Sequence, residues 1–335
     1  MRCLDIMKSL VLTSDGLELR DTPKPAVMPG YARIEVRSVG ICRSDIRVWQ
    51  GDIKVDLPII LGHEITGTIQ ETSVRDLAIG TPVTTEVNLF CGRCWYCSQN
   101  QRHLCPNRDI IGLTVNGGLA EYISVPVELL HVLPEDVDTT IGTFIEPLSS
   151  AIQTYRRVPA KEDEPVLVVG SGKVGLLVSQ VYDAFGADVY LLGQNLWQLG
   201  LARTLGLRNT LNTDNQDWKS KILSATNGVG PRVVVDCSGT PSGFNTALEL
   251  VRSGGHLALM STPGDGIPID TRKIVKREIT LVGNSSGSFD KAIDMLAKGR
   301  IEVNKLVSRE FALEDGAEAF ENAAQPEVAK VIIHI

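Results

Sequence analysis

Four cysteines lie within fifteen residues of this chain, and their spacing is that of a metal site. Cys91, Cys94, Cys97 and Cys105 follow the pattern C-x2-C-x2-C-x7-C. Gaps this short let four thiolates surround one tetrahedral zinc ion and leave no ligand position for a substrate. A ferredoxin run shares the first three cysteines, but its last gap holds three residues, not seven. The spacing therefore predicts a structural zinc site in a lobe that spans residues 90–106.

A cysteine and a histidine further along the chain suggest a second metal site. Cys42 lies in the segment GICRSD, and His63 lies in GHE. Taken alone, these residues are more simply interpreted as a buried thiol and a hydrogen-bonded histidine. Glu146, however, stands in the otherwise apolar segment FIEPL, where burying an unpaired carboxylate would be costly. A cysteine, a histidine and a glutamate can hold a catalytic zinc ion whose fourth position stays open.

A glycine-rich turn points to a dinucleotide. The run Gly170, Ser171, Gly172, Lys173, Val174 and Gly175 fits G-x-G-x-x-G. It follows an apolar, β-branched run and precedes a helical pattern, which is the context in which this motif binds a pyrophosphate at a helix N-terminus. A glycine-rich connection without a ligand is the alternative.

The choice between NAD and NADP depends on the end of the next strand, where a carboxylate usually binds the ribose. Gly193, Gln194 and Asn195 occupy this place, so no acid is present to repel a 2′-phosphate. The arginine expected for NADP is also missing, so the cofactor is NAD or NADP, and the missing acid favours NADP. Later strand ends offer four more candidate cofactor contacts, Ser238, Gly239, Asn284 and Ser285.

The elements that must position these residues fall into two groups. From about residue 9 to 145, short strands broken by glycine and proline predict a barrel-like β unit. From Pro165 onward, apolar runs alternate with helices, which predicts a parallel sheet covered on both faces. We expect an α/β chain in which residues 1–150 and 286–335 form one domain and residues 151–285 form the other.

Composition excludes several classes of protein. The chain has 335 residues, of which 43% are hydrophobic and 22% charged, with a net charge of −7. This length predicts two domains. Scattered cationic residues argue against a nucleic-acid surface or an acidic membrane partner, and no apolar run is long enough to span a bilayer. With no signal segment, we expect a cytoplasmic protein with reduced thiols rather than disulfides.

In their order along the chain, these motifs resemble the zinc-dependent medium-chain dehydrogenase/reductase family of the alcohol dehydrogenase superfamily. The segment Glu146-Pro147-Leu148 resembles its polyol branch, which includes sorbitol, threonine and sugar dehydrogenases. The resemblance implies a GroES-like β-barrel catalytic domain and a doubly wound parallel Rossmann domain. It also implies two zinc ions per chain, one structural and one catalytic.

The resemblance further implies roles for single residues. Cys42 and His63 would bind the catalytic zinc ion, with Glu64 and Glu146 as alternatives for the third ligand. Ser44 would hydrogen-bond the substrate hydroxyl and begin proton release.

Two more residues of this segment are given roles by the same resemblance. Asp45 would orient His63. Relatives commonly carry a proton-relaying histidine where this chain has Arg47. An arginine stays protonated, so Arg47 binds an anionic or polyhydroxyl substrate group, or else forms a surface ion pair.

The function expected from these residues is reversible oxidation of a secondary alcohol, such as a polyol or a sugar, to a ketone with NAD(P). We expect a small-molecule substrate and a homodimer or homotetramer. One alternative is a zinc-free NADPH-dependent quinone or enone reductase, although such enzymes lack the cysteine lobe. Another is a non-catalytic dinucleotide-binding redox sensor.

Overall fold

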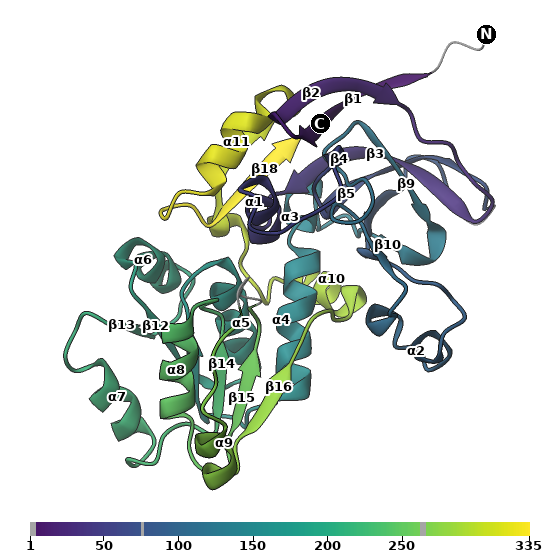
Figure 1. Cartoon of the computed structure of the whole chain (residues 1–335). Coiled ribbons are helices and arrows are strands. Elements are labelled where there is room, and N and C mark those ends of the chain that lie inside the picture. Colours follow the sequence, from purple (N-terminus) through teal and green to yellow (C-terminus); the bar gives the residue numbers. More distant parts are fainter. Residues whose placement is uncertain (1–4, 75–76, 262–265) are drawn as a thin grey trace. The chain divides into compact units, whose positions relative to one another are not determined.

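The computed structural model describes residues 5–74, 77–261 and 266–335. These residues form two compact units (Figure 1). The first unit comprises Met1–Glu146 and Val307–Ile335, and the second comprises Pro147–Leu306.

The first unit is built mainly of strands. Its elements are β1 (Ile6–Thr13), β2 (Gly16–Pro23), β3 (Tyr31–Gly40), α1 (Arg43–Trp49), β4 (Ile59–Ile60), β5 (Glu64–Thr72), β6 (Pro82–Thr85), β7 (Asn88–Leu89), α2 (Trp95–Ser98), η1 (Arg102–Leu104), β8 (Asp109–Ile110), β9 (Tyr122–Pro126), η2 (Val127–Leu129), β10 (Leu130–Val132), α3 (Thr139–Gly142), β17 (Val307–Ala312), η4 (Leu313–Asp315), α11 (Gly316–Ala323) and β18 (Lys330–His334).

A seven-stranded sheet is the framework of this unit. Its strand order is β10-β6-β5-β3-β18-β17, and β9 also pairs with β3. Along β3, Ala32, Ile34 and Val36 are buried while the residues between them are more exposed, which is the alternation of a strand with one face on a core. The C-terminal strand β18, yellow in Figure 1, lies against the purple β3 near the other end of the chain.

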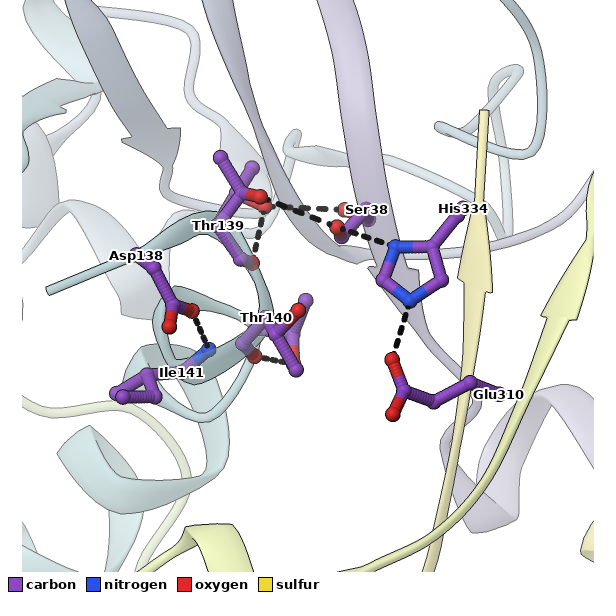
Figure 2. A network of polar contacts seen from close by, with 9 residues as sticks. Ser38, Asp138, Thr139, Thr140, Ile141, Glu310 and His334 are labelled. Carbon is purple, nitrogen blue, oxygen red and sulfur yellow. Dashed lines mark hydrogen bonds and ion pairs between the residues drawn. The ribbon is translucent and has the colours of Figure 1, made fainter.

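A polar network fixes the C-terminal strands to this sheet, as Figure 2 shows. His334 on β18 lies between Ser38 and Glu310, with Nδ1 3.1 Å from the serine oxygen and Nε2 2.6 Å from the carboxylate. Thr66 on β5 donates to the backbone oxygens of Ser38 and Thr139, at 3.2 and 2.6 Å. Strands β5, β3, β18 and β17 and helix α3 are thereby joined through side chains as well as through the ladder.

The second unit alternates strands and helices. Its elements are α4 (Ile145–Arg157), which begins at the unit boundary, β11 (Pro165–Val169), α5 (Lys173–Ala184), β12 (Asp188–Gly193), α6 (Leu196–Thr204), β13 (Asn209–Asn212), α7 (Trp218–Ala225), β14 (Val233–Asp236), α8 (Pro241–Leu250), β15 (His256–Leu259), α9 (Thr271–Arg277), β16 (Thr280–Gly283), α10 (Phe289–Ala297) and η3 (Asn304–Leu306).

A six-stranded parallel sheet forms the centre of the second unit, with the order β13-β12-β11-β14-β15-β16. The order reverses direction at β11, which is the arrangement of a doubly wound dinucleotide-binding sheet. Val166 to Val168 and Val233 to Val235 are fully buried, as in strands covered on both faces. The parallel sheet predicted from the sequence is therefore confirmed.

The boundary expected at residue 286 is wrong, because residues 286–306 pack within the second unit. The apolar side of α10, with Phe289 and Met295, is buried. Beyond this helix, the amide of Gln180 on α5 forms two hydrogen bonds with the backbone of Glu302, at 3.1 and 2.8 Å. The burial of α10 and the hydrogen bonds of the Gln180 side chain thus hold this segment in the second unit, and only β17 onward returns to the first unit.

A bidentate ion pair stabilises the second unit. The Arg232 guanidinium donates from Nε and Nη2 to the two oxygens of Glu164, both at 2.7 Å, and these hydrogen bonds lower the pKa of that carboxyl. We expect Glu164→Gln to lower the free energy of unfolding by about 2 kcal/mol at pH 7, because a charge-assisted pair becomes a neutral one. Urea unfolding of both proteins measures the difference.

The pH dependence of this difference follows from the lowered pKa. A carboxyl with a lowered folded pKa stabilises the protein above its unfolded pKa, so the difference should shrink as pH falls below about 4.3. Glu249→Gln is the matched control, because the exposed Lys219–Glu249 pair should contribute less than about 1 kcal/mol. Equal effects of the two substitutions would contradict this account of the Glu164 pair.

Candidate functional site

Strand pairing brings Cys42 and His63 together. Cys42 follows β3 and is the N-cap of α1, while His63 directly precedes β5. In the antiparallel ladder between β3 and β5, Gly40 is opposite Glu64. Residues just after Gly40 and just before Glu64 therefore meet at the same end of the two strands.

Three of the predicted ligands form one group. Ligand atoms of Cys42, His63 and Glu64 all lie within 4.8 Å of one another, so one ion can reach all three. Among the described residues this group contains Glu64 and does not include Glu146, which lies in the first turn of α4. Of the two carboxylates proposed from the sequence, the geometry favours Glu64.

Asp45 fixes the orientation of His63. Its carboxylate is fully buried and lies 3.2 Å from His63 Nδ1, and its other oxygen accepts a hydrogen bond of 2.8 Å from the Cys42 backbone N–H. Burial by itself would raise the pKa of Asp45, but His63 and the backbone donors lower it overall. With Nδ1 held in this way, Nε2 is the nitrogen left to face a metal or the Ser44 hydroxyl, which lies 3.4 Å from it.

Two arginines lie on α1, the helix that Cys42 caps. Arg47 Nε lies 3.8 Å from the Asp52 carboxylate, and Arg43 is exposed at the start of the helix. The ion pair agrees with the simpler of the two interpretations of Arg47.

The predicted cysteine lobe comes together as one cluster. Ligand atoms of Cys91, Cys94, Cys97 and Cys105 lie within 4.8 Å of one another, with Cys94 Sγ 3.5 Å from Cys97 and 3.7 Å from Cys105. Four sulfurs at about 2.3 Å from one tetrahedral ion lie about 3.8 Å apart, so the spacing matches a single zinc ion. Backbone N–H groups of Arg93 and Cys94 lower the pKa of Cys91 to about 6, whereas burial and the neighbouring thiols raise the pKa of Cys97 to about 12.

The glycine-rich turn of the second unit is closely packed on one side and open on the other. A Cβ at Gly175 would overlap the carbonyl oxygen of Gly170, and Gly170 itself has φ +108° and no room beside the Cys237 backbone. Gly172, the N-cap of α5, would meet no atom within 4 Å. The open space at the N-terminus of α5 fits a pyrophosphate.

Packing explains why no carboxylate ends β12. A Cβ at Gly193 would overlap Ser171 Oγ, which donates to Gln198 at 2.8 Å. Asn195 caps α6, because its side-chain oxygen accepts from the N–H groups of Trp197 and Gln198. Ser171 thus occupies the space that an acid at position 193 would need.

The remaining candidate cofactor residues lie at the carboxyl ends of later strands. Asp236, buried at the end of β14, accepts from the N–H and hydroxyl of Ser238 at 2.9 and 2.6 Å. Gly239 N–H donates to Ser261 at 3.0 Å. After β16, the Asn284 amide donates to the Ser150 carbonyl at 2.8 Å.

These four candidates do not share one role. Ser285 contributes its carbonyl oxygen, which accepts a hydrogen bond from the Ser150 hydroxyl. Ser238 and Gly239 belong to a turn shaped by Asp236, whereas Asn284 and Ser285 join the end of β16 to α4. All four lie at the edge of the sheet where dinucleotides bind.

Two residues beside the metal group were missed by the sequence interpretation. Lys330, the first residue of β18, is fully buried and forms an ion pair with Glu64. Gly40 leaves room for this pair, because a Cβ there would lie 2.5 Å from Glu64 Oε2. A lysine at the head of the apolar run KVIIHI was the available signal. Its partner is more than 200 residues away and could not be found from spacing.

Two family models match the chain. The model described as alcohol dehydrogenase GroES-like domain matches residues 28–135, and the model described as zinc-binding dehydrogenase matches residues 174–298. The first match lies in the β-rich unit and the second in the unit with the parallel sheet. These are the two folds that the sequence predicted.

Among the described residues, none of the helices has both the length and the apolar composition of a membrane span.

Similar proteins align with nearly the whole chain. A D-arabitol-phosphate dehydrogenase of Enterococcus avium is 30% identical over 95% of this chain and 94% of its own. A sorbitol dehydrogenase of Halalkalibacterium halodurans is 30% identical over 98% and 99%. The solved structure of a zinc-binding dehydrogenase of Sinorhizobium meliloti 1021 bound to NADP is 29% identical, with a TM-score of 0.91, over 99% and 100%.

A methyl group at Gly172 tests the dinucleotide site. We expect Gly172→Ala to leave the melting temperature unchanged, because no atom lies within 4 Å, and to weaken NAD(P)H binding about tenfold or more, since the methyl would face the pyrophosphate. Fluorescence titration with NADH and NADPH measures the affinity.

Gly200→Ala is the control for this test. Gly200 lies within α6 and is equally open, so the change should stabilise the protein by about 0.5–1 kcal/mol and leave cofactor binding unchanged. Unaltered affinity in Gly172→Ala would show that the pyrophosphate lies elsewhere.

Proposed function

The chain belongs to the zinc-type medium-chain alcohol dehydrogenases of the polyol branch, and from this premise we propose that it oxidises a secondary alcohol of a polyol to a ketone while NAD(P) accepts the hydride. The observation that carries the proposal is the group of Cys42, His63 and Glu64. Three protein ligands leave the fourth position of a zinc ion for a substrate oxygen.

The residues of the first unit would perform the proton chemistry. A zinc ion held by Cys42, His63 and Glu64 would supply a Lewis acid that lowers the pKa of the substrate hydroxyl. Ser44 would hydrogen-bond the substrate hydroxyl and relay its proton, accepting it while passing its own proton to water. Its hydroxyl lies 3.4 Å from His63 Nε2, the nitrogen that would bind the metal. Asp45 keeps His63 in the required orientation from Nδ1.

The residues of the second unit would hold the cofactor. The nicotinamide, when bound, supplies the hydride acceptor. Gly170, Gly172 and Gly175 shape the turn for its pyrophosphate, and the residues at the ends of β14 and β16 line the same edge of the sheet. A glycine at position 193 places no negative charge beside the ribose, so we propose that NADP is accepted at least as well as NAD.

The further parts of the proposal concern stoichiometry and substrate. Two zinc ions per chain are proposed, one in the cysteine lobe and one at Cys42. The relatives named for arabitol phosphate and sorbitol support polyols or their phosphates as the substrate class. A cytoplasmic homodimer or homotetramer is proposed as the working form.

Removal of the Cys42 thiol tests the metal assignment. We expect Cys42→Ala to reduce the zinc content from two ions per chain to one and to lower turnover by about a hundredfold or more, because a catalytic ligand is lost. Cys237→Ala is the control, since that thiol belongs to neither metal group and the variant should keep both ions. Zinc is counted by mass spectrometry of metals. Undiminished turnover in Cys42→Ala would contradict the proposal.

A substrate panel tests the reaction. Zinc-loaded enzyme is offered polyols, polyol phosphates, threonine and simple secondary alcohols with NAD or with NADP, and the reduced cofactor is followed by its near-ultraviolet absorbance. We expect turnover with at least one polyol or polyol phosphate, and a ketone as the product. Cofactor binding without turnover on any of these would support the redox sensor, and turnover limited to quinones with NADPH would support the reductase.

A further inference from the structure

A buried ion pair includes one of the proposed ligands of the catalytic metal. Lys330 and Glu64 have no exposed side-chain surface, and the Lys330 ammonium contacts Glu64 Oε2. Burying a single charge in an apolar interior is costly unless a partner of opposite charge compensates it. The pair therefore fixes where the Glu64 carboxylate can lie.

Strand order makes the pair possible. Lys330 is on β18 and Glu64 is on β5, and β3 runs between these two strands. On β3, Gly40 is the residue that pairs with Glu64 on one side and with Ile332 on the other. A side chain at Gly40 would clash with the Lys330 ammonium and approach Glu64 Oε2 to 2.5 Å, so the glycine leaves the space in which the two charges meet.

Lys330 and Glu64 each have a further neighbour that bears on the pair. The Phe144 ring centroid lies 5.1 Å from Nζ, where the ring face stabilises a cation. An oxygen of Glu64 also lies within 4.8 Å of the ligand atoms of Cys42 and His63. The Glu64 carboxylate thus contacts the buried ammonium and also lies within reach of Cys42 and His63.

We propose that Lys330 is a positioning residue that engages one oxygen of Glu64, so that Glu64 binds the catalytic zinc ion through a single oxygen and the fourth position stays open for substrate. The inference rests on the proposed function of the Cys42 site. A carboxylate can bind a metal through one oxygen or through both. Without Lys330, Glu64 can turn both oxygens to the ion, which closes the position that the alcohol needs.

Lys330→Met removes the charge and keeps much of the side-chain volume. The probe is Co²⁺ in place of zinc, because tetrahedral cobalt absorbs visible light more strongly than cobalt with five or six ligands. The spectrum of Cys42→Ala protein, which keeps only the lobe metal, is subtracted to isolate the catalytic site. We expect Lys330→Met to weaken this difference spectrum, to slow removal of the catalytic metal by a chelator about tenfold, and to lower kcat/KM about tenfold or more.

Two further variants separate positioning from stability. Gly40→Ala keeps both charges but fills the space between them, so it should reproduce the weaker cobalt spectrum even if Lys330→Met does not fold. Lys8→Met is the matched control. The Lys8–Glu314 pair is exposed and neither residue is a proposed metal ligand, so this substitution should change neither the cobalt spectrum nor the rate of metal release.

The outcomes distinguish this inference from the proposed function. Wild-type protein that takes up one metal ion per chain, in the cysteine lobe, would overturn both. Wild-type protein with two metal ions and polyol oxidation, combined with unchanged cobalt spectra in Lys330→Met or Gly40→Ala, would overturn the role of Lys330 alone. A lower melting temperature with an unchanged spectrum is the result expected of a purely structural lysine, and it would also overturn the inference.

Discussion

The first unit depends on the compensation of buried charges at the first residues of β5 and β18 and in helix α1. Asp45, Glu64 and Lys330 have no exposed surface, and His63 is nearly as buried. Isolated, each charge would destabilise the fold by several kcal/mol, and each has a partner in contact: Asp45 with His63 and Glu64 with Lys330. The same pairings set the direction in which His63 and Glu64 face, so stability and metal binding rest on one set of contacts.

Strand order converts this electrostatic constraint into a site. The C-terminal strand β18 must lie beside β3 for Lys330 to reach Glu64, and the network around His334 holds it there from the far end of the strand. Glycine at position 40 then leaves the necessary space. In the second unit, packing also shapes the site. A side chain at position 193 would clash with Ser171, and the glycine found there provides no acid that would select against NADP.

Local patterns were enough to predict much of the fold and the metal groups. The cysteine lobe has ligands close in sequence, so its spacing alone predicted a cluster that the structure contains. The alternation of apolar strands and helices is also a local pattern, and it predicted the parallel sheet. Residue types suggested Cys42 and His63 as ligands, and the resemblance to a family strengthened the suggestion. Spacing could not show that they meet, because their proximity comes from the register of β3 and β5.

Other features depend on contacts that a sequence does not display. Glu64 is favoured over Glu146 as the third ligand because strand pairing places the Glu64 carboxylate near Cys42. The domain boundary was misplaced because the amide pairing of Gln180 with Glu302 joins residues that no local pattern connects. Lys330 was overlooked because a charged residue in an apolar strand is explained only by its partner.

Anomalous diffraction at the zinc absorption edge, from crystals grown without chelator, would locate the metal ions. We expect two anomalous peaks per chain, one among the four lobe cysteines and one between Cys42 and His63 with a single Glu64 oxygen beside it. A single peak in the lobe, with Cys42 and His63 free of metal, would contradict it.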